Sequence, residues 1–225
     1  MAKSADQRAS TRAAGSGELL NAHADGRLKA GADPDPRCVG IIVALPEPLA
    51  TEITNFRRSF GDRLGAVIPA HITLVTTTPA EDWEETVGHV REVAREQHPF
   101  TVAVSGTASF RPVSPVVYLQ IQEGFEECVR LHEKLQSGPL ARDLAFNFHP
   151  HITVAHDIGA AGLDEAAGTL EDFAATFPVT GMGLYEHDSS GVWLLKEELN
   201  FGGTSEKQST RRCEAAADRA GKTQA

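Results

Sequence analysis

The stretch His149-Pro150-His151-Ile152-Thr153-Val154 decides how the rest of the chain is interpreted. An earlier segment, Pro69-Ala70-His71-Ile72-Thr73-Leu74, repeats the tripeptide His-Ile-Thr and the aliphatic residue that follows it. The histidines of the two tripeptides, His71 and His151, lie 80 positions apart. Each copy is short, alternating and rich in β-branched residues, which predicts a strand.

Alternation along a strand places the histidine and the threonine of each copy on the same face. His71 and Thr73 therefore share one face, and His151 and Thr153 share one face of the second strand. The aliphatic residues point to the opposite face, which is the natural core side. Each polar face then presents an imidazole and a hydroxyl about 6–7 Å apart along the strand.

Two copies of this face favour a catalytic centre, whereas a single copy is usually only a half-exposed strand surface. If an approximate two-fold axis relates the copies, two imidazoles and two hydroxyls meet. One neutral and one charged imidazole can act as general base and general acid on opposite sides of a phosphorus atom. The hydroxyls can donate to the non-bridging oxygens. This chemistry needs no metal ion, no cofactor and no covalent intermediate.

At these residues the sequence resembles the two-histidine phosphoesterases. That family includes the bacterial RNA 2′,3′-cyclic phosphodiesterases, historically called 2′-5′ RNA ligases. Its mark is a pair of His-x-Thr/Ser-aliphatic motifs separated by roughly this interval, and the second copy, preceded by Phe148, is especially similar. The resemblance covers about residues 37 to 202. The paired motif is far more specific than either copy alone.

The resemblance implies an enzyme that hydrolyses 2′,3′-cyclic phosphodiesters to 2′-phosphates. It implies His71 as the acid for the leaving 3′ oxygen and His151 as the base for water, an assignment that the residues alone leave open. Thr73 and Thr153 are expected to bind the phosphoryl oxygens. By microscopic reversibility the same pair could join 2′-5′ RNA ends. We expect a monomer that binds a small nucleotide or an RNA terminus with a cyclic phosphate.

One departure from the family concerns the residues after the second motif, where relatives often carry a basic residue. Here the chain reads Ala155-His156-Asp157. His156 is five residues from His151 and faces away on a regular strand, so only a bulge or a strand end would bring it to the site. Arg111 is a candidate substitute for phosphate binding. Phe110, Tyr118 and Phe148 are candidates for stacking on a base.

Two other interpretations stay open. The first is a metal-dependent hydrolase, because His149, His151, His156 and Asp157 fall within nine residues. A zinc site needs three well-placed ligands, however, and this interpretation leaves the first tripeptide without a role. The second is a module that binds a nucleotide or an RNA end without turnover, and no sequence feature excludes it.

Composition narrows the classes of function. The chain has 225 residues, 41% of them hydrophobic, and a formal net charge of −10. A domain that grips a long stretch of nucleic acid is usually basic, so no extended nucleic-acid interface is expected. No apolar run is long enough for a membrane span, and the first residues contain no apolar segment typical of a secretion signal, so we expect neither feature. Three cysteines without a CxxC motif indicate reduced thiols, and we expect a cytoplasmic protein.

The chain is expected to divide into a tail over 1–36, a phosphoesterase domain over 37–202 and a charged tail over 203–225. The pattern of the domain predicts an α+β fold with two pseudo-symmetric lobes. Two antiparallel sheets are expected to face a central cleft, with the helices on the outside. Strands are predicted over 39–45, 70–75, 100–110, 116–121, 149–154, 177–186 and 192–199, and helices over 46–60, 78–98, 124–135 and 163–173.

Overall fold

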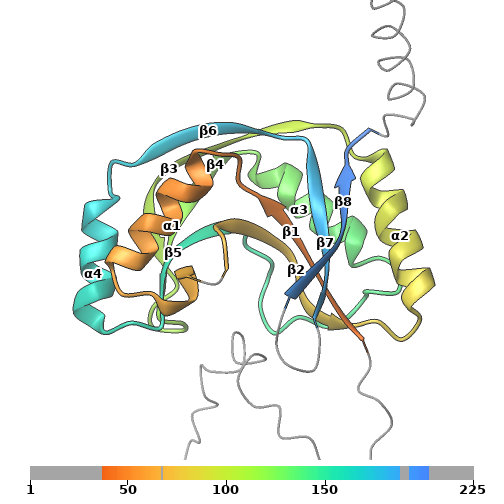
Figure 1. The fold of residues 1–225 in the computed structure, drawn as a ribbon, viewed down its shortest axis with the longest axis horizontal. Helices are drawn as coiled ribbons and strands as arrows, with labels where there is room; N and C mark the ends of the chain where they lie inside the picture. Colours follow the sequence, from red (N-terminus) through yellow and green to blue (C-terminus); the bar gives the residue numbers. More distant parts are fainter. Residues whose placement is uncertain (1–36, 67, 188–192, 203–225) are drawn as a thin grey trace, which may run out of the picture.

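The computed structural model of the protein describes residues 37–66, 68–187 and 193–202. The predicted tails, 1–36 and 203–225, and most of the predicted turn at 187–191 lie outside the described residues. The elements, labelled in Figure 1, are β1 (Cys38–Ala44), α1 (Leu49–Ser59), a 3-10 helix η2 (Arg63–Ala66), β2 (His71–Pro79), α2 (Trp83–Glu96), β3 (Phe100–Ser109), β4 (Val116–Glu123), α3 (Phe125–Leu135), β5 (His151–His156), α4 (Ala160–Thr169), β6 (Ala174–Val179), β7 (Gly181–His187) and β8 (Trp193–Asn200). The predicted α+β class is confirmed.

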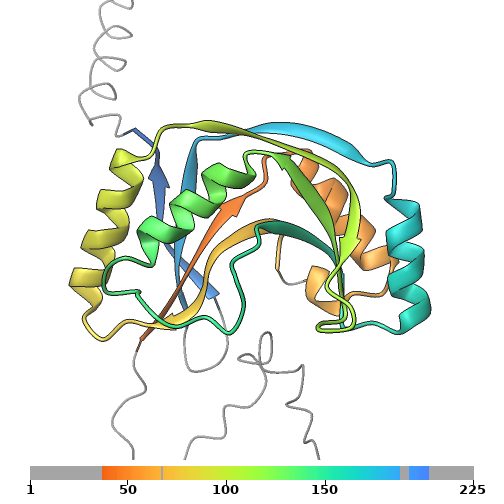
Figure 2. The ribbon, with the colours of Figure 1, turned by 180° about the vertical axis from the view of Figure 1, so that it is seen from behind.

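The strands form one antiparallel sheet in the order β6-β3-β4-β5-β2-β1-β7-β8. The prediction of two separate sheets is wrong in this respect, because the two motif strands pair with each other at the centre. They are joined there by one residue pair, Ile72 with Ile152. The sheet curves into an arch, seen from both sides in Figures 1 and 2. This central pairing brings the two copies of the motif side by side.

The helices pack on both halves of the sheet, one half containing β6, β3, β4 and β5 and the other containing β2, β1, β7 and β8. Helices α1 and α4 contact strands of the half that contains β5, α2 contacts strands of the half that contains β2, and α3 contacts β2 and also β4 (Figure 1). Helix α1 precedes β2 in the chain but packs against β5, and α3 precedes β5 but packs against β2. Each motif strand is therefore covered by the helix that leads into the other one.

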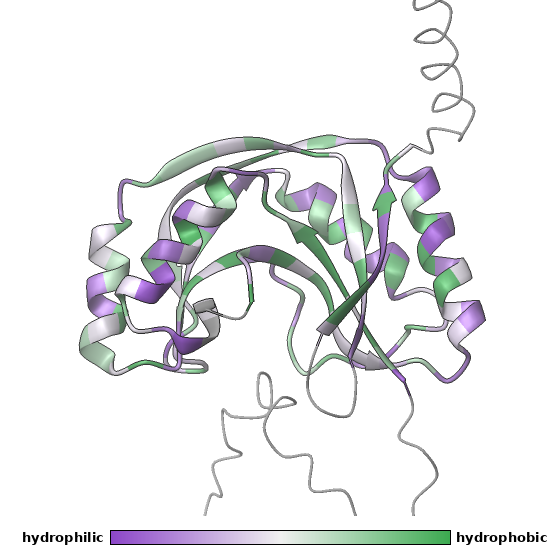
Figure 3. Cartoon of the chain, in the orientation of Figure 1, coloured by the Kyte–Doolittle hydropathy of each residue, from purple (hydrophilic) through white to green (hydrophobic). Residues whose placement is uncertain are grey.

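The core lies on the face of the sheet opposite the motif histidines. Ile72 and Ile152 are both 0% exposed and belong to one continuous hydrophobic cluster with the buried faces of the helices. In Figure 3 the helices carry hydrophilic residues on one side and hydrophobic residues on the other. Burial of an isoleucine of this kind contributes about 1.5–3 kcal/mol. The predicted direction of the aliphatic residues is therefore confirmed. No helix among the described residues is long and apolar enough to cross a bilayer.

The strand predicted over 177–186 is two strands, and this prediction is wrong. The strands β6 and β7 are separated by Thr180 and lie in different halves of the sheet. β6 pairs with β3 at one edge, whereas β7 pairs with β1 and β8. The chain runs across the top of Figure 1 as β6 and then bends downward into β7. Pro178 and Gly181 flank Thr180, and residues of these types are breaker signals, so the local sequence does carry an indication of the break.

The predicted start of α2 is also wrong. Strand β2 continues through Thr78, which pairs with Val39 of β1, so the Thr-Pro step ends a strand and does not begin a helix. Asp82 caps α2 instead, because its side chain accepts a hydrogen bond of 2.9 Å from the backbone N–H of Glu85. Helix α4 occupies Ala160–Thr169, a few residues earlier than predicted.

Candidate active site

The central strand pair brings four polar residues of the two motifs together on one face. Because Ile72 lies opposite Ile152 in an antiparallel ladder, His71 lies across from Thr153 and Thr73 across from His151. Side chains of such cross-strand neighbours start about 4.5–5.5 Å apart. All four are half-buried. We call these four residues the quartet, and each histidine in it has a hydroxyl from the other copy beside it.

Both imidazoles are anchored through the same nitrogen. The Nδ1 atom of His71 lies 2.8 Å from the carbonyl oxygen of Pro69, and that of His151 lies 2.8 Å from the carbonyl oxygen of His149. A carbonyl only accepts, so Nδ1 carries the proton in each neutral ring and Nε2 carries a lone pair. In the first copy, the hydroxyl of Thr73 donates to Nε2 of His71 over 3.1 Å. The backbone thus presets Nε2 as the nitrogen that exchanges a proton.

A β-bulge follows the threonine in both motif strands. In β5, Tyr118 pairs with Thr153 and Val117 with Ala155, so Val154 is the extra residue. The bulge reverses the alternation, because Val154 and Ala155 are both 0% exposed. His156, opposite Val116, therefore returns to the face that carries the quartet. On a regular strand His156 would face away from the quartet, and the bulge in β5 turns it to the quartet face.

An aromatic cluster borders the quartet on the side of β4. It consists of Phe110, Tyr118, Phe125 and His149. The rings of Phe110 and Tyr118 stack with centroids 4.3 Å apart, and their centroids lie 4.9 Å and 5.3 Å from that of His151. His149 packs against Phe125 at 5.2 Å and against Phe110 at 5.6 Å. The sequence predicted Phe110 and Tyr118 near the site, but not Phe125.

The other flank of the quartet is not aromatic. On β1, Ala44 pairs with His71 and Ile42 pairs with Thr73. Ala44 is exposed and Ile42 is half-buried, so small or aliphatic surface borders the first motif. The two sides of the quartet therefore differ in chemistry, although the motifs themselves are alike.

Arg111, the candidate for phosphate binding, forms an ion pair in this structure. Its Nη1 donates to the carboxylate of Asp164 in α4 over 2.8 Å, and its Nε donates to the hydroxyl of Ser109 over 3.1 Å. A guanidinium paired with a carboxylate has given part of its donor capacity to that partner. Arg111 therefore ties the loop after β3 to α4 in this structure.

The cluster of ligands that a metal-dependent hydrolase would need is not assembled. Within 37–66, 68–187 and 193–202, no three His, Cys, Asp or Glu side chains are placed to hold one metal ion. His149, His151, His156 and Asp157 are close in sequence but do not form such a group. The geometry among the described residues therefore favours the paired histidines over a metal centre.

Comparison with known proteins agrees with this arrangement. The model of the 2′-5′ RNA ligase superfamily matches residues 45–191, which is more than half of the chain. The chain belongs to the 2′-5′ RNA ligase superfamily. A protein of Bacillus licheniformis with a provisional phosphoesterase name is 36% identical over 167 residues, covering 72% of this chain and 97% of that protein. A similarly named protein of Bacillus mycoides is 29% identical over 165 residues, covering 72% and 95%.

Solved structures share the fold of this superfamily member. The crystal structure of Escherichia coli LigT complexed with NADP+ superposes with a TM-score of 0.55 at 18% identity, covering 75% of this chain and 99% of LigT. The complex of LigT with 3′-AMP superposes with a TM-score of 0.54 at 17% identity and the same coverage. At this level of identity, the likeness concerns the fold alone.

Arg57 is a residue near the superfamily motif that the sequence did not indicate. It is 4% exposed, and its Nε donates to Asp62 over 2.9 Å while Nη1 donates to the carbonyl oxygen of Ile68 over 3.1 Å. Ile68 lies just before Pro69, whose carbonyl anchors His71. Only the fold shows this contact, because Arg57 sits late in α1 like any surface arginine of an amphipathic helix.

Burial lowers the pKa of both catalytic candidates. For His71, burial is the main cause, the hydrogen bond to Pro69 opposes it, and the charge of Arg57 lowers the pKa further. Burial lowers the pKa of His151 to about 4, and the charges of His149 and His71 add to this effect. At neutral pH, both rings of the free protein are neutral.

The lowered pKa values predict the pH dependence of catalysis. The base must be neutral, so activity falls as pH drops below its pKa, and the acid must be protonated, so activity falls as pH rises above its pKa. Because both values lie below the ordinary 6.5, we expect a bell-shaped kcat/KM profile with its maximum below about pH 6.5. A bound phosphate anion favours the charged rings, so kcat should peak at a higher pH than kcat/KM. Coinciding maxima above pH 7 would contradict this assignment.

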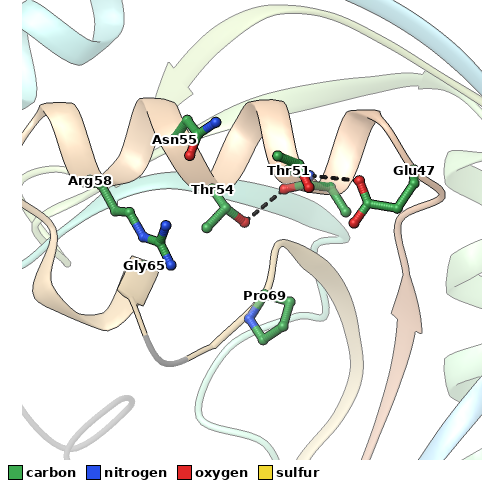
Figure 4. Close-up of a pocket in the computed structure, with 8 residues that line it drawn as sticks. Glu47, Thr51, Thr54, Asn55, Arg58, Gly65 and Pro69 are labelled. Atoms are coloured by element: carbon green, nitrogen blue, oxygen red, sulfur yellow. Dashed lines mark hydrogen bonds between the residues drawn. The ribbon is translucent and has the colours of Figure 1, made fainter.

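A separate pocket lies beside the quartet, between α1 and the segment that leads into β2. Figure 4 shows its polar lining, which includes Thr51, Thr54 and Arg58, and its volume is about 240 Å³. Thr54 donates to Ala50 of its own helix, and the N–H of Thr51 donates to the nearby Glu47. Pro69 lines this pocket and also anchors His71, so the two places share one segment of backbone.

Proposed function

We propose that residues 37–202 form a phosphoesterase domain that hydrolyses 2′,3′-cyclic phosphodiesters to 2′-phosphates without a metal ion. The observation that carries this proposal is the quartet, in which two imidazoles with preset Nε2 atoms stand beside two hydroxyls on adjacent strands. This arrangement can hold one phosphorus atom between a base and an acid. Membership of the 2′-5′ RNA ligase superfamily supports the same class of reaction.

In the proposed reaction, Nε2 of the neutral histidine takes a proton from water as the water oxygen attacks phosphorus. Nε2–H of the charged histidine gives its proton to the ribose oxygen as the P–O bond of the ring breaks. Each transfer contributes roughly 10²–10⁴-fold to the rate. We assign His151 as base and His71 as acid, as the resemblance to the two-histidine phosphoesterases implies; burial lowers the pKa of both rings. The reverse reaction would join 2′-5′ RNA ends.

Thr73 and Thr153 are proposed to donate to the non-bridging oxygens of the phosphoryl group. In the free protein, Thr73 donates to Nε2 of His71, and turning its hydroxyl toward the phosphate would free that nitrogen. The second threonine lies across from His71 in the ladder. A charge-assisted hydrogen bond of this kind contributes about 1.5–3 kcal/mol.

The aromatic cluster is the proposed binding surface for the base of the substrate. Phe110 is half-buried and its ring lies 4.9 Å from that of His151, so a base could stack on it, while Tyr118, which is 6% exposed, supports Phe110 by stacking on it at 4.3 Å. His156 reaches the same face at the end of β5 and is proposed to contact the substrate. Structures of LigT with 3′-AMP and with phosphate support a small nucleotide as ligand. The net charge of −10 favours such a ligand over a long nucleic acid.

A direct test is to incubate the purified protein with 2′,3′-cyclic nucleotides, 3′,5′-cyclic nucleotides and 2′-5′ dinucleotides, with and without EDTA. We expect hydrolysis of the 2′,3′-cyclic compounds to 2′-phosphates at an unchanged rate in EDTA, because no step uses a metal. Loss of activity in EDTA would contradict the mechanism, and a 3′-phosphate product would contradict the assigned leaving group. Binding of a 2′-nucleotide without hydrolysis would instead indicate a non-catalytic binding module.

A further inference from the structure

His132 is a buried polar residue that the proposed reaction does not use. It lies in α3, is 7% exposed, and contacts segments of both motif copies. Its Nδ1 lies 2.7 Å from the carbonyl oxygen of Leu74, in β2. Its ring stacks on Phe148, with centroids 3.9 Å apart and planes 7° from parallel, in the segment that enters β5. One side chain therefore touches both halves of the site.

The contact in the first copy falls on its bulge. In β2, Ile42 of β1 pairs with Thr73 and Ile41 pairs with Val75, so Leu74 is the residue left out of the ladder. Leu74 directly follows Thr73 of the quartet. The carbonyl of Leu74 accepts from His132, so Nδ1 of His132 carries the proton in the neutral ring. This bond fixes the backbone one residue beyond the threonine.

The contact in the second copy falls on the residue before His149. The carbonyl of His149 is the group that anchors Nδ1 of His151. Phe148 is half-buried and packs against the hydrophobic core, so its ring is a fixed point in the segment. Parallel stacking of the His132 ring on this phenyl ring limits the movement of the carbonyl that orients His151.

The backbone pairing between the two motif strands is short. The motif strands β2 and β5 are joined by only one residue pair, whereas each pairs over several residues with its other neighbour. The distance between the two imidazoles is therefore not set by the ladder alone. Helix α3 leads into the second motif but packs on the first, and His132 is its polar contact there.

We propose that His132 is a positioning residue that sets the distance between His71 and His151 by linking the bulge of β2 to the segment before β5. The catalytic consequence rests on the proposed function, whereas the structural link does not. A displacement of about 1 Å in a catalytic pair can lower the rate by as much as 10²-fold, so the effect should appear mainly in kcat.

Three variants separate the two contacts. His132→Phe keeps a ring for stacking and removes the donor, whereas His132→Asn keeps an N–H donor and removes the ring. Phe148→Leu keeps the donor and removes the stacking partner. A control is His89→Phe, because His89 of α2 also bonds a backbone carbonyl, that of Leu135 at the end of α3, at 3.1 Å, and among the described residues its ring forms no hydrogen bond with β2 or β5.

For hydrolysis of a 2′,3′-cyclic nucleotide, we expect His132→Phe to lower kcat at least about 10-fold, with KM changed less than about threefold. His132→Asn should recover part of this loss. Phe148→Leu should lower kcat in the same direction. His89→Phe should keep the wild-type kcat, even if it lowers the melting temperature as much as His132→Phe does. Equal effects of His132→Phe and His89→Phe on kcat would overturn the proposal.

A second readout does not depend on turnover. The ring protons of His71 and His151 are followed by NMR as pH is lowered, in the wild type and in the His132 and Phe148 variants. We expect the variants to raise both titration midpoints toward 6.5. If the His71 and His151 rings become more hydrated and move apart, burial and mutual repulsion lower their pKa values less. Unchanged midpoints in every variant that folds would overturn the proposal. A wild type that hydrolyses nothing would overturn the proposed function, and the NMR comparison would still decide the role of His132.

Discussion

Replacing His151 with alanine is expected to lower hydrolysis of a 2′,3′-cyclic nucleotide by at least about 100-fold, and His71→Ala by a similar factor. In the proposed mechanism, each histidine performs one of two proton transfers on the same phosphorus atom. Because a backbone carbonyl holds Nδ1 of each ring, Nε2 is the atom that exchanges the proton, and the alanine variant lacks it. The measurement is kcat at the pH optimum of the wild type.

The control for these variants is His98→Ala, because His98 is exposed just after α2 and outside the quartet. It should keep wild-type kcat. Circular dichroism should show that all three variants fold, since the side chains of His71 and His151 lie outside the hydrophobic cluster. Wild-type turnover in either His71→Ala or His151→Ala would refute a paired mechanism.

The second large effect is expected from the threonines. Thr73→Val and Thr153→Val keep the shape of the side chain and remove the hydroxyl, so each should lower kcat roughly 10- to 100-fold through loss of about 1.5–3 kcal/mol of transition-state stabilisation. The double variant should lose more than either single one. Thr→Ser at the same positions should keep most of the rate, because it keeps the donor.

Thr76→Val is the matched control for the threonine variants. Thr76 lies in the same strand, is exposed, and follows the residues of the bulge. It should leave kcat unchanged. If Thr73→Val and Thr153→Val raised KM without lowering kcat, the hydroxyls would bind the ground state and the transition state equally. That result would remove their role as transition-state donors.

The sequence predicted elements whose periodicity is local, and it failed where distant pairing decides. The alternation of β-branched residues located both motif strands, and the aliphatic side of each became the core. The break at Thr180 was missed because one apolar run was read across Pro178 and Gly181, whereas β6 and β7 pair with strands that are distant in the sequence. The single central sheet was also missed, since one pair between Ile72 and Ile152 leaves no local signal.

The prediction of the candidate site had the same limits. The repeated tripeptide identified the quartet, because a repeat is visible without a fold. The bulge that turns His156 back to the quartet face is a property of the β4–β5 register. Arg111 was proposed for the site, but its ion pair with Asp164 could only be seen in three dimensions. Arg57 and His132 were missed for the same reason, as both act through backbone carbonyls of remote segments.

The central claim is that the two imidazoles serve one phosphorus atom. The most direct measurement is a crystal structure of the protein with a bound 2′-nucleotide or inorganic phosphate. We expect Nε2 of His71 and Nε2 of His151 each within about 3.2 Å of an oxygen on the same phosphorus, with the hydroxyls of Thr73 and Thr153 on its remaining oxygens. A phosphate bound by only one histidine, or held elsewhere on the protein, would contradict the mechanism.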